Sequence, residues 1–129
     1  MKVSVTNEGM NYRARTDAGM ELDIVYGDDK PTDDPSMNPL EIFLSSLGMC
    51  IAVMLRKYCE AHDLDVPEIG VTVSGDFEPG DEVCENVAAT VEMPGDWDER
   101  RKAAFLKVAE TCPVHNTLCM CGHMDITVI

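Results

Sequence analysis

Hydrophobic and polar residues alternate in three short segments near the N-terminus. The segments are 2–6, 12–15 and 20–26, and the turn sequence 17–19 (Asp-Ala-Gly) separates the last two. A period of two is typical of strands that bury one face. We therefore predict an antiparallel meander, followed by a loop over 28–36 because that segment is rich in Asp and Pro.

A long apolar segment comes next and predicts a helix. Residues 42–55 contain no charged side chain. Asn38 is a good N-cap, Pro39 suits the first helical position, and Glu41 lies three residues past the cap, as in a capping box. A helix that is apolar on nearly all sides is expected to be buried, so we predict a central helix from Pro39 to about His62. Its partner is expected to be a second subunit.

The pattern then returns to strands. Segments 69–75 and 86–93 alternate again, and a polar loop joins them. A helix is predicted over 97–111 with Asp96 as its cap, and a closing strand over 124–129.

The predicted order of elements is β-β-β-α-β-β-α-β. This order indicates an α+β fold in which a mainly antiparallel sheet packs on the long central helix. With 129 residues the chain is expected to form a single domain over 1–129.

The charge balance narrows the range of partners. The chain has 24 acidic and 10 basic side chains, a net charge of −14, which argues against binding nucleic acid or anionic membranes. The uncharged run over 42–55 is shorter than the roughly 18 residues of a membrane span, and no signal peptide is recognised. We expect a cytoplasmic protein whose six cysteines are thiols, metal ligands or redox groups.

Two of the cysteines stand out. Cys50 lies inside the apolar helix, and Cys112 opens the string Cys112-Pro113-Val114-His115 about sixty residues later. They look like a redox pair acting on a peroxide or an electrophile, since a thiolate is a strong nucleophile. The alternative is that Cys50 is only a small buried hydrophobic residue, because burial raises a thiol's pKa and makes it inert.

The residues that follow Cys112 give a separate reason to expect a reactive thiol there. If Pro113 begins a helical turn, Cys112 is the N-cap, where free N–H groups favour an anion. His115 would lie one turn further and could move a proton, or it could be an ordinary structural histidine.

A rival interpretation groups the C-terminal Cys and His residues as a metal site. Thiolates and imidazoles suit zinc and softer ions, although the Cys-x-Cys step is tight for a tetrahedral site. An open alternative is that one of these cysteines is an additional resolving thiol. The candidate ligands, besides Cys112, are His115, Cys119, Cys121 and His123.

Three motifs, taken in order, resemble those of the OsmC/Ohr family. They are 38–41 (Asn-Pro-Leu-Glu), 48–50 (Gly-Met-Cys) and 112–115 (Cys-Pro-Val-His), and the resemblance covers essentially the whole chain. It implies an intertwined α+β homodimer. It also implies a thiol-dependent peroxidase that reduces organic hydroperoxides.

The resemblance also implies roles for individual residues. Cys50 would attack the peroxide, and Cys112 would resolve the product as a disulfide. Arg13, six residues before Gly19, would support the thiolate, with Arg15 in reserve.

Glu41 would stand for the family's glutamate, one position later than in the peroxidases, where this chain has Leu40. Nine residues at ~100° each place Glu41 opposite Cys50 on an unbroken helix. Glu41 is otherwise interpreted as a capping residue alone.

Together these features predict an antioxidant peroxidase that uses Cys50 and Cys112, binds no cofactor and takes electrons from an external dithiol. The alternative function is a non-enzymatic carrier of thiols, sulfur or metal that uses the C-terminal Cys/His cluster.

Overall fold

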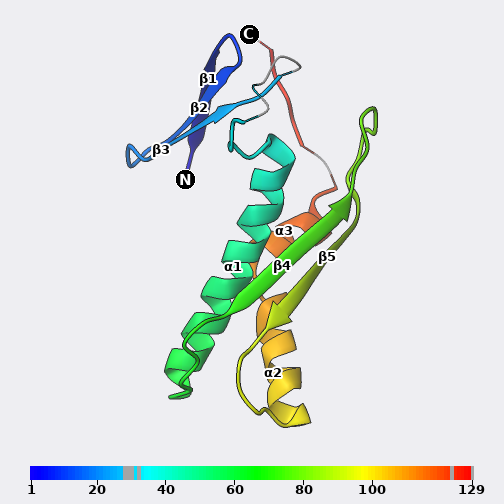
Figure 1. Cartoon of the computed structure of the whole chain (residues 1–129). Helices are drawn as coiled ribbons and strands as arrows, with labels where there is room; N and C mark the ends of the chain where they lie inside the picture. Colours follow the sequence, from blue (N-terminus) through cyan, green and yellow to red (C-terminus); the bar gives the residue numbers. More distant parts are fainter. Residues whose placement is uncertain (28–30, 32, 123, 129) are drawn as a thin grey trace. The chain divides into compact units, whose positions relative to one another are not determined.

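The computed structural model describes residues 1–27, 31, 33–122 and 124–128. Two compact units make up the chain, residues 1–43 and residues 44–129 (Figure 1).

The N-terminal unit contains the predicted meander. Its sheet has the antiparallel order β1-β2-β3, formed by Val3–Glu8, Asn11–Thr16 and Glu21–Val25. The β2–β3 turn depends on Gly19, which has a φ of 83° and donates its N–H to the Thr16 carbonyl at 3.0 Å. Glycine adopts this left-handed conformation without steric cost. The loop predicted over 28–36 falls partly outside the described residues, and its described part, residues 31 and 33–36, forms no helix or strand.

The helix α1 (Pro39–Ala61) begins where the sequence predicts. The Asn38 side chain accepts the Glu41 N–H at 2.9 Å, and the Glu41 carboxylate accepts the Asn38 N–H at 2.7 Å. This reciprocal pair is a capping box, which satisfies two backbone donors that would otherwise lack partners at the start of a helix.

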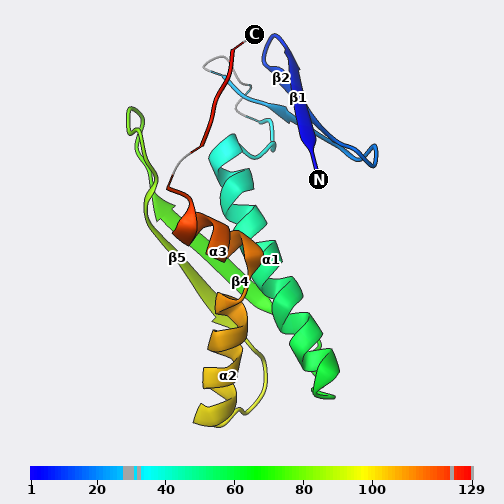
Figure 2. The ribbon, with the colours of Figure 1, turned by 180° about the vertical axis from the view of Figure 1, so that it is seen from behind.

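In the second unit, α1 packs against a hairpin of β4 (Gly70–Asp76) and β5 (Glu85–Glu92). Figures 1 and 2 show the helices of this unit on one side of the hairpin. The helix presents a buried stripe with a spacing of four residues, which places its members on one face. These residues are Leu47, Ile51, Leu55 and Cys59.

Gly48 lets the helix approach the hairpin closely. A Cβ atom at this position would lie 3.3 Å from the Val73 Cγ2 atom and 3.9 Å from the Val71 Cγ1 atom. A larger side chain would therefore push α1 away from β4, because packed interiors have little free space.

The second helix, α2 (Glu99–Glu110), begins two residues later than predicted. Asp98, not Asp96, is the N-cap, and its side chain accepts the Arg101 N–H at 2.7 Å. Trp97 explains the shift. Its indole N–H donates to the Met93 carbonyl at 3.1 Å and its ring packs edge-on to Phe105, so this residue stays outside the helix.

The C-terminal part departs most from the prediction. The string after Cys112 forms an eight-residue helix, α3 (Pro113–Met120), in place of a single turn. The predicted closing strand is wrong for the described residues, because 124–128 are extended but pair with no strand there. A strand needs a partner backbone for its hydrogen bonds, and alternation of side chains does not supply one.

The α+β class is confirmed, with antiparallel sheets and, in the described residues, three helices. The strands form a three-stranded and a two-stranded sheet, where the sequence predicted one mainly antiparallel sheet.

The helix α1 is more membrane-like by composition than its uncharged run suggested. It has 23 residues, and an 18-residue window within it has a mean hydropathy of 1.5. By length and composition alone, a helix of this kind could cross a membrane. One such helix is a weak indication, since a core helix of a soluble protein meets the same test. Five α1 residues are buried in this structure.

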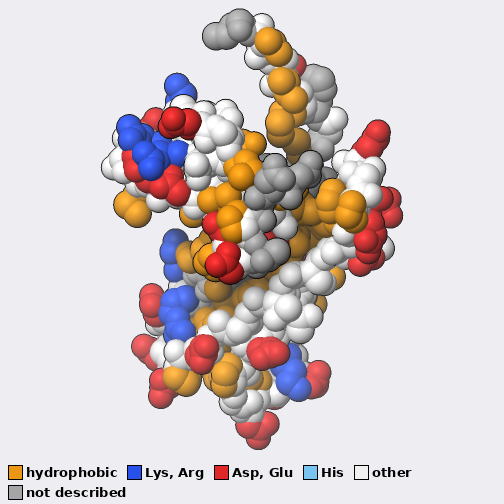
Figure 3. Space-filling view, turned by 45° about the horizontal axis from the view of Figure 1, so that its top comes forward, with side chains coloured by type: hydrophobic (Ala, Val, Ile, Leu, Met, Phe, Trp, Pro, Cys, Tyr) orange, Lys and Arg blue, Asp and Glu red, His pale blue; other side chains and the backbone are white. Residues whose placement is uncertain are grey.

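The surface reflects the acidic composition. Figure 3 shows acidic side chains gathered at the outer end of the β4–β5 hairpin. The exposed acidic residues of this hairpin include Glu78, Asp81, Glu82 and Glu85. The acidic residues of the composition therefore gather in part at this end of the hairpin.

Candidate functional site

The second unit brings two predicted cysteines together. Cys50 is half-buried on α1, and Cys112 is completely buried at the junction of α2 and α3. Both are free thiols, and Cys50 lies close enough to Cys112 to raise the pKa of the Cys112 thiol. Two residues separated by more than sixty positions in the sequence are therefore neighbours in the fold.

The backbone on both sides of Cys112 holds its side chain in place between α2 and α3. The backbone N–H of Cys112 still bonds to the Ala109 carbonyl of α2 at 3.2 Å, and Pro113 immediately begins α3. Cys112 is the N-cap of α3, as the sequence suggested, and its sulfur accepts the His115 N–H at 3.5 Å.

The N-cap position does not make Cys112 acidic. Burial raises the pKa of the Cys112 thiol, and its hydrogen bond to Cys50 raises the pKa further. The backbone N–H groups of His115 and Val114 act in the opposite direction but are weaker. Because burial penalises the thiolate more than the helix end stabilises it, Cys112 remains a neutral thiol at ordinary pH.

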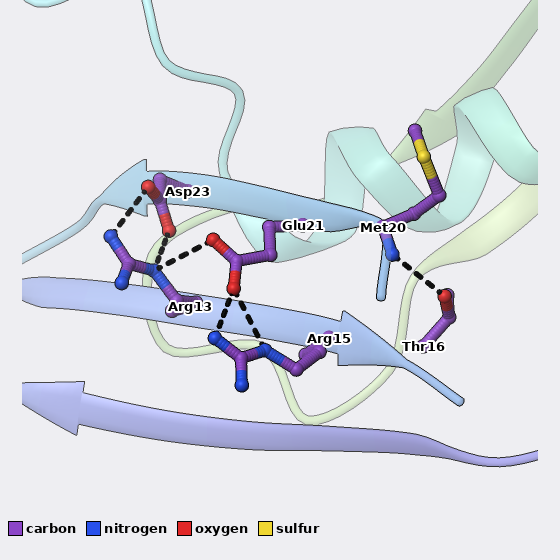
Figure 4. A network of polar contacts seen from close by, with 6 residues as sticks. All are labelled: Arg13, Arg15, Thr16, Met20, Glu21 and Asp23. Carbon is purple, nitrogen blue, oxygen red and sulfur yellow. Dashed lines mark hydrogen bonds and ion pairs between the residues drawn. The ribbon is translucent and has the colours of Figure 1, made fainter. Parts of the chain in front are cut away.

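Arg13 belongs to the N-terminal unit, on β2, where Asp23 of β3 faces it (Figure 4). The guanidinium donates two hydrogen bonds to the Asp23 carboxylate, at 2.7 and 3.0 Å. The hydrogen bond from Arg13 lowers the pKa of Asp23, and Asp23 in turn raises the pKa of Arg13. Arg13 thus remains a cation whose charge is balanced locally, by Asp23 first and by the more distant Glu21 second.

The neighbouring pair repeats the arrangement. Arg15 donates to Glu21 with its Nε 2.7 Å from the carboxylate, and Arg13 lies 3.7 Å from the same residue (Figure 4). Sequence reasoning missed these pairs. The signal was present, because residues equally far from Ala18, the centre of the turn, are cross-strand neighbours in this hairpin.

Glu41 takes part in the capping box described above. The interpretation of Glu41 as a capping residue is therefore confirmed in its geometry. A role for this carboxylate in catalysis stays a prediction.

A pair formed by a cysteine and a histidine lies on α3. The Cys119 sulfur is 3.5 Å from the His115 Nε2 atom, and the His115 Nδ1 atom is 3.2 Å from the Glu110 carbonyl oxygen. Cys119 is exposed and His115 is half-buried. The sequence analysis named both residues but not their pairing, because a spacing of four residues matters only once the helix is known to extend to Met120.

The rest of the proposed metal cluster is not assembled in the described part of the chain. Cys121 is exposed and ends α3, and its backbone N–H donates to the Thr117 carbonyl. His123 lies outside the described residues. Among the residues that the structure describes, no three His, Cys, Asp or Glu side chains are arranged to hold a metal ion.

Several solved structures resemble this fold. A putative osmotic stress induced and detoxification response protein from Psychrobacter arcticus has a TM-score of 0.75 at 17% identity, over 91% of this chain and 87% of that chain. An organic hydroperoxide resistance protein OsmC from Legionella pneumophila has a TM-score of 0.64 at 17% identity, over 92% and 89%. OhrB of Bacillus subtilis, an organic hydroperoxide resistance protein, has a TM-score of 0.59 at 21% identity, over 91% and 90%.

At these identities the structural likeness shows the fold alone. A comparison with curated protein sequences gives no significant match. The family described as OsmC-like protein matches residues 28–127, which is most of the sequence and includes both Cys50 and Cys112. The chain therefore belongs to the OsmC-like protein family.

Proposed function

We propose that this protein is a thiol-dependent peroxidase that reduces organic hydroperoxides with Cys50 and Cys112. The observation that carries the proposal is the closeness of these two free thiols, one half-buried and one completely buried, with Cys50 near enough to raise the pKa of Cys112. The names of the relatives from Legionella pneumophila and Bacillus subtilis, which refer to organic hydroperoxide resistance, support the choice of substrate class.

The proposed reaction has three balanced steps. The Cys50 sulfur attacks the peroxide ROOH and breaks its O–O bond, giving a sulfenic acid and the alcohol ROH. The Cys112 thiol then displaces water from the sulfenic acid and forms the Cys50–Cys112 disulfide. An external dithiol reduces this disulfide by exchange and is itself oxidised.

The raised pKa of Cys112 suits the resolving role. A hydrogen bond that raises this pKa is one in which Cys112 keeps its proton and donates it toward the Cys50 sulfur. Cys50 is the more accessible of the two sulfurs, so a hydroperoxide reaches it first. This difference in exposure supports Cys50 as the attacking thiol.

Arg13 is proposed as the cation that stabilises the thiolate and the departing alkoxide, since a guanidinium stays charged in any surroundings. Its ion pair with Asp23 would have to loosen or be shared for this role. Arg13→Ala should slow the first step by at least about 10-fold. Arg15→Ala is the matched control, because it removes a neighbouring paired arginine of the same strand.

The two cysteines can be tested separately. We expect Cys50→Ser to abolish consumption of an organic hydroperoxide such as cumene hydroperoxide in the presence of dithiothreitol. Cys112→Ser should permit one turnover and accumulate a sulfenic acid on Cys50 that dimedone traps. Oxidised wild-type protein should contain the Cys50–Cys112 disulfide, located by mass spectrometry.

Cys84→Ser is a suitable control for the loss of a half-buried thiol from the same unit, and it should keep full activity. Glu41→Gln tests the remaining candidate, because the amide oxygen can still accept the Asn38 N–H. A loss of activity in this variant with unchanged stability would show a catalytic role. The proposal fails if Cys50→Ser keeps wild-type activity, or if the wild type consumes no hydroperoxide.

We further propose a homodimer in the cytoplasm. Proteins of the OsmC-like family are generally soluble, and α1 leaves the apolar side chains of Met49 and Val53 64% and 51% exposed. A second subunit would cover this face, because apolar surface is normally removed from water. Sedimentation equilibrium at micromolar concentration should give twice the chain mass, and a stable monomer would contradict the proposal.

A further inference from the structure

The pair formed by His115 and Cys119 has the geometry of an activated nucleophile. A thiol next to an imidazole, with a third group that orients the ring, is the usual arrangement for drawing a proton from sulfur. Here the Cys119 sulfur lies 3.5 Å from the His115 Nε2 atom, and the Glu110 carbonyl is the orienting group.

The Glu110 contact also fixes which ring nitrogen carries the hydrogen. A carbonyl oxygen can only accept, and it lies 3.2 Å from the His115 Nδ1 atom. In the neutral ring Nδ1 therefore holds the hydrogen and donates it, which leaves a lone pair on Nε2. That lone pair faces the Cys119 sulfur, so the ring can accept the thiol proton.

The position of Cys119 makes it reachable from solvent. The residue is exposed, one turn from the half-buried His115 and on the last turn of α3. Cys112, at the opposite end of the same helix, is completely buried. Seven residues of helix separate the two sulfur-bearing positions by about 10 Å along the axis, so a disulfide between them would require α3 to unwind.

We propose that Cys119 is a second reactive thiol, independent of the buried pair, that exchanges with low-molecular-weight disulfides. The Cys119 sulfur attacks one sulfur of RSSR, forms the mixed disulfide Cys119–S–S–R and releases RSH. His115 takes the proton from Cys119 and delivers it to the leaving thiolate. Cys119 is oxidised, one sulfur of RSSR is reduced, and no further reactant is needed.

The test uses the full-length reduced protein and 2-hydroxyethyl disulfide, an uncharged probe that the acidic surface does not repel. Peptide mass spectrometry follows the adduct at each cysteine with time. Cys121 is the internal comparison, because it is also exposed and lies two residues away. We expect Cys119 to react at least about 10-fold faster than Cys121, the low end of general-base effects.

The role of the imidazole is tested with His115→Ala. This change removes the ring but keeps the backbone N–H that bonds to the Cys112 sulfur. The rate at Cys119 should fall about 10-fold and recover on addition of free imidazole, a response that a structural role would not produce. Equal rates at Cys119 and Cys121, or a rate unchanged by His115→Ala, would overturn the proposal.

A measurement on the wild type needs no variant. Nitrogen-15 NMR of the neutral His115 ring should show the hydrogen on Nδ1, and a ring with its hydrogen on Nε2 would contradict the assignment. Hydroperoxide consumption distinguishes this proposal from the peroxidase function. Cys119→Ser should remove the fast adduct without changing peroxide turnover.

Discussion

Cys112 and Cys119, at opposite ends of α3, differ in what surrounds their sulfur atoms. Cys112, at the start of the helix, is completely buried and shares a hydrogen bond with another thiol. Cys119, near its end, is exposed and faces an imidazole nitrogen. One sulfur is kept neutral by its surroundings, and the other lies beside a base.

The difference shows that a helix position does not by itself decide the chemistry of a thiol. Cys112 has the N-cap place that favours an anion, yet burial raises its pKa. Cys119 has no advantage from the helix dipole, since it lies near the C-terminal end, but it has a proton acceptor. At Cys112, burial and the neighbouring Cys50 therefore outweigh the effect of the helix end.

The largest effect is expected from opening the core around the buried pair. Leu55 is completely buried in the same core as Cys112, so Leu55→Ala should lower the free energy of unfolding by about 2–5 kcal/mol. Leu106→Ala on α2 is the control, because that side chain is 61% exposed and its loss should cost less than about 0.5 kcal/mol. Urea unfolding of both variants measures the contrast, and equal losses would contradict the assigned core.

Alkylation rates compare the sulfurs directly. In native reduced protein, Cys112 and Cys59 should react with N-ethylmaleimide at least about 100-fold more slowly than Cys119, since a buried thiol reacts only after local opening. Peptide mass spectrometry gives the individual rates, and in urea the difference should disappear. Fast labelling of Cys112 under native conditions would show that the pair is not enclosed.

Removing each sulfur separately compares how much Cys112 and Cys119 contribute to the free energy of unfolding. Cys112→Ala leaves a small cavity and should cost about 1–2 kcal/mol of unfolding free energy. Cys119→Ala should stay within about 0.5 kcal/mol of the wild type, because the residue is exposed. Thermal or urea unfolding checks both, and a larger loss for Cys119→Ala would reverse the comparison.

The smallest expected effect is a dependence of stability on pH. Burial raises the pKa of Cys112 above its ordinary value of 9.0, and burial also raises the pKa of Cys59. The native state then holds protons that the unfolded chain has begun to release, so this stabilisation is complete below about pH 9 and declines above it. Urea unfolding of reduced protein from pH 7 to 10 should show the decline.

Cys112→Ala is the variant that tests the origin of this decline. Its stability should fall less steeply above pH 9 than that of the wild type, whatever its stability at pH 7. An identical slope in the two proteins would mean that the Cys112 proton makes no contribution.

Local signals in the sequence predicted much of this molecule. The capping box of Asn38 and Glu41 could be predicted from the sequence because the two residues are only three positions apart. The N-terminal meander and the β4–β5 hairpin followed from alternation and turn residues. The N-cap role of Cys112 followed from the proline after it.

Other features depend on residues that are distant in sequence. The start of α2 moved to Asp98 because the Trp97 ring packs on Phe105. The described part of the predicted strand over 124–129 pairs with no other strand. Alternation of side chains predicted a strand there but could not show which strand it would pair with. The sequence suggested Cys50 and Cys112 as a redox pair, and the family resemblance gave each a role, but neither could show that the two sulfurs are neighbours.

The sequence by itself determined the α+β class, the family and the residues capable of thiol chemistry. The tertiary structure decided which of those residues meet and which are accessible. It brought Cys50 close to Cys112, paired Arg13 with Asp23, and placed His115 beside Cys119. The physical reason is that helix caps and turns are local, whereas the desolvation and hydrogen bonding that set a thiol's behaviour come from whatever the folded chain packs around it.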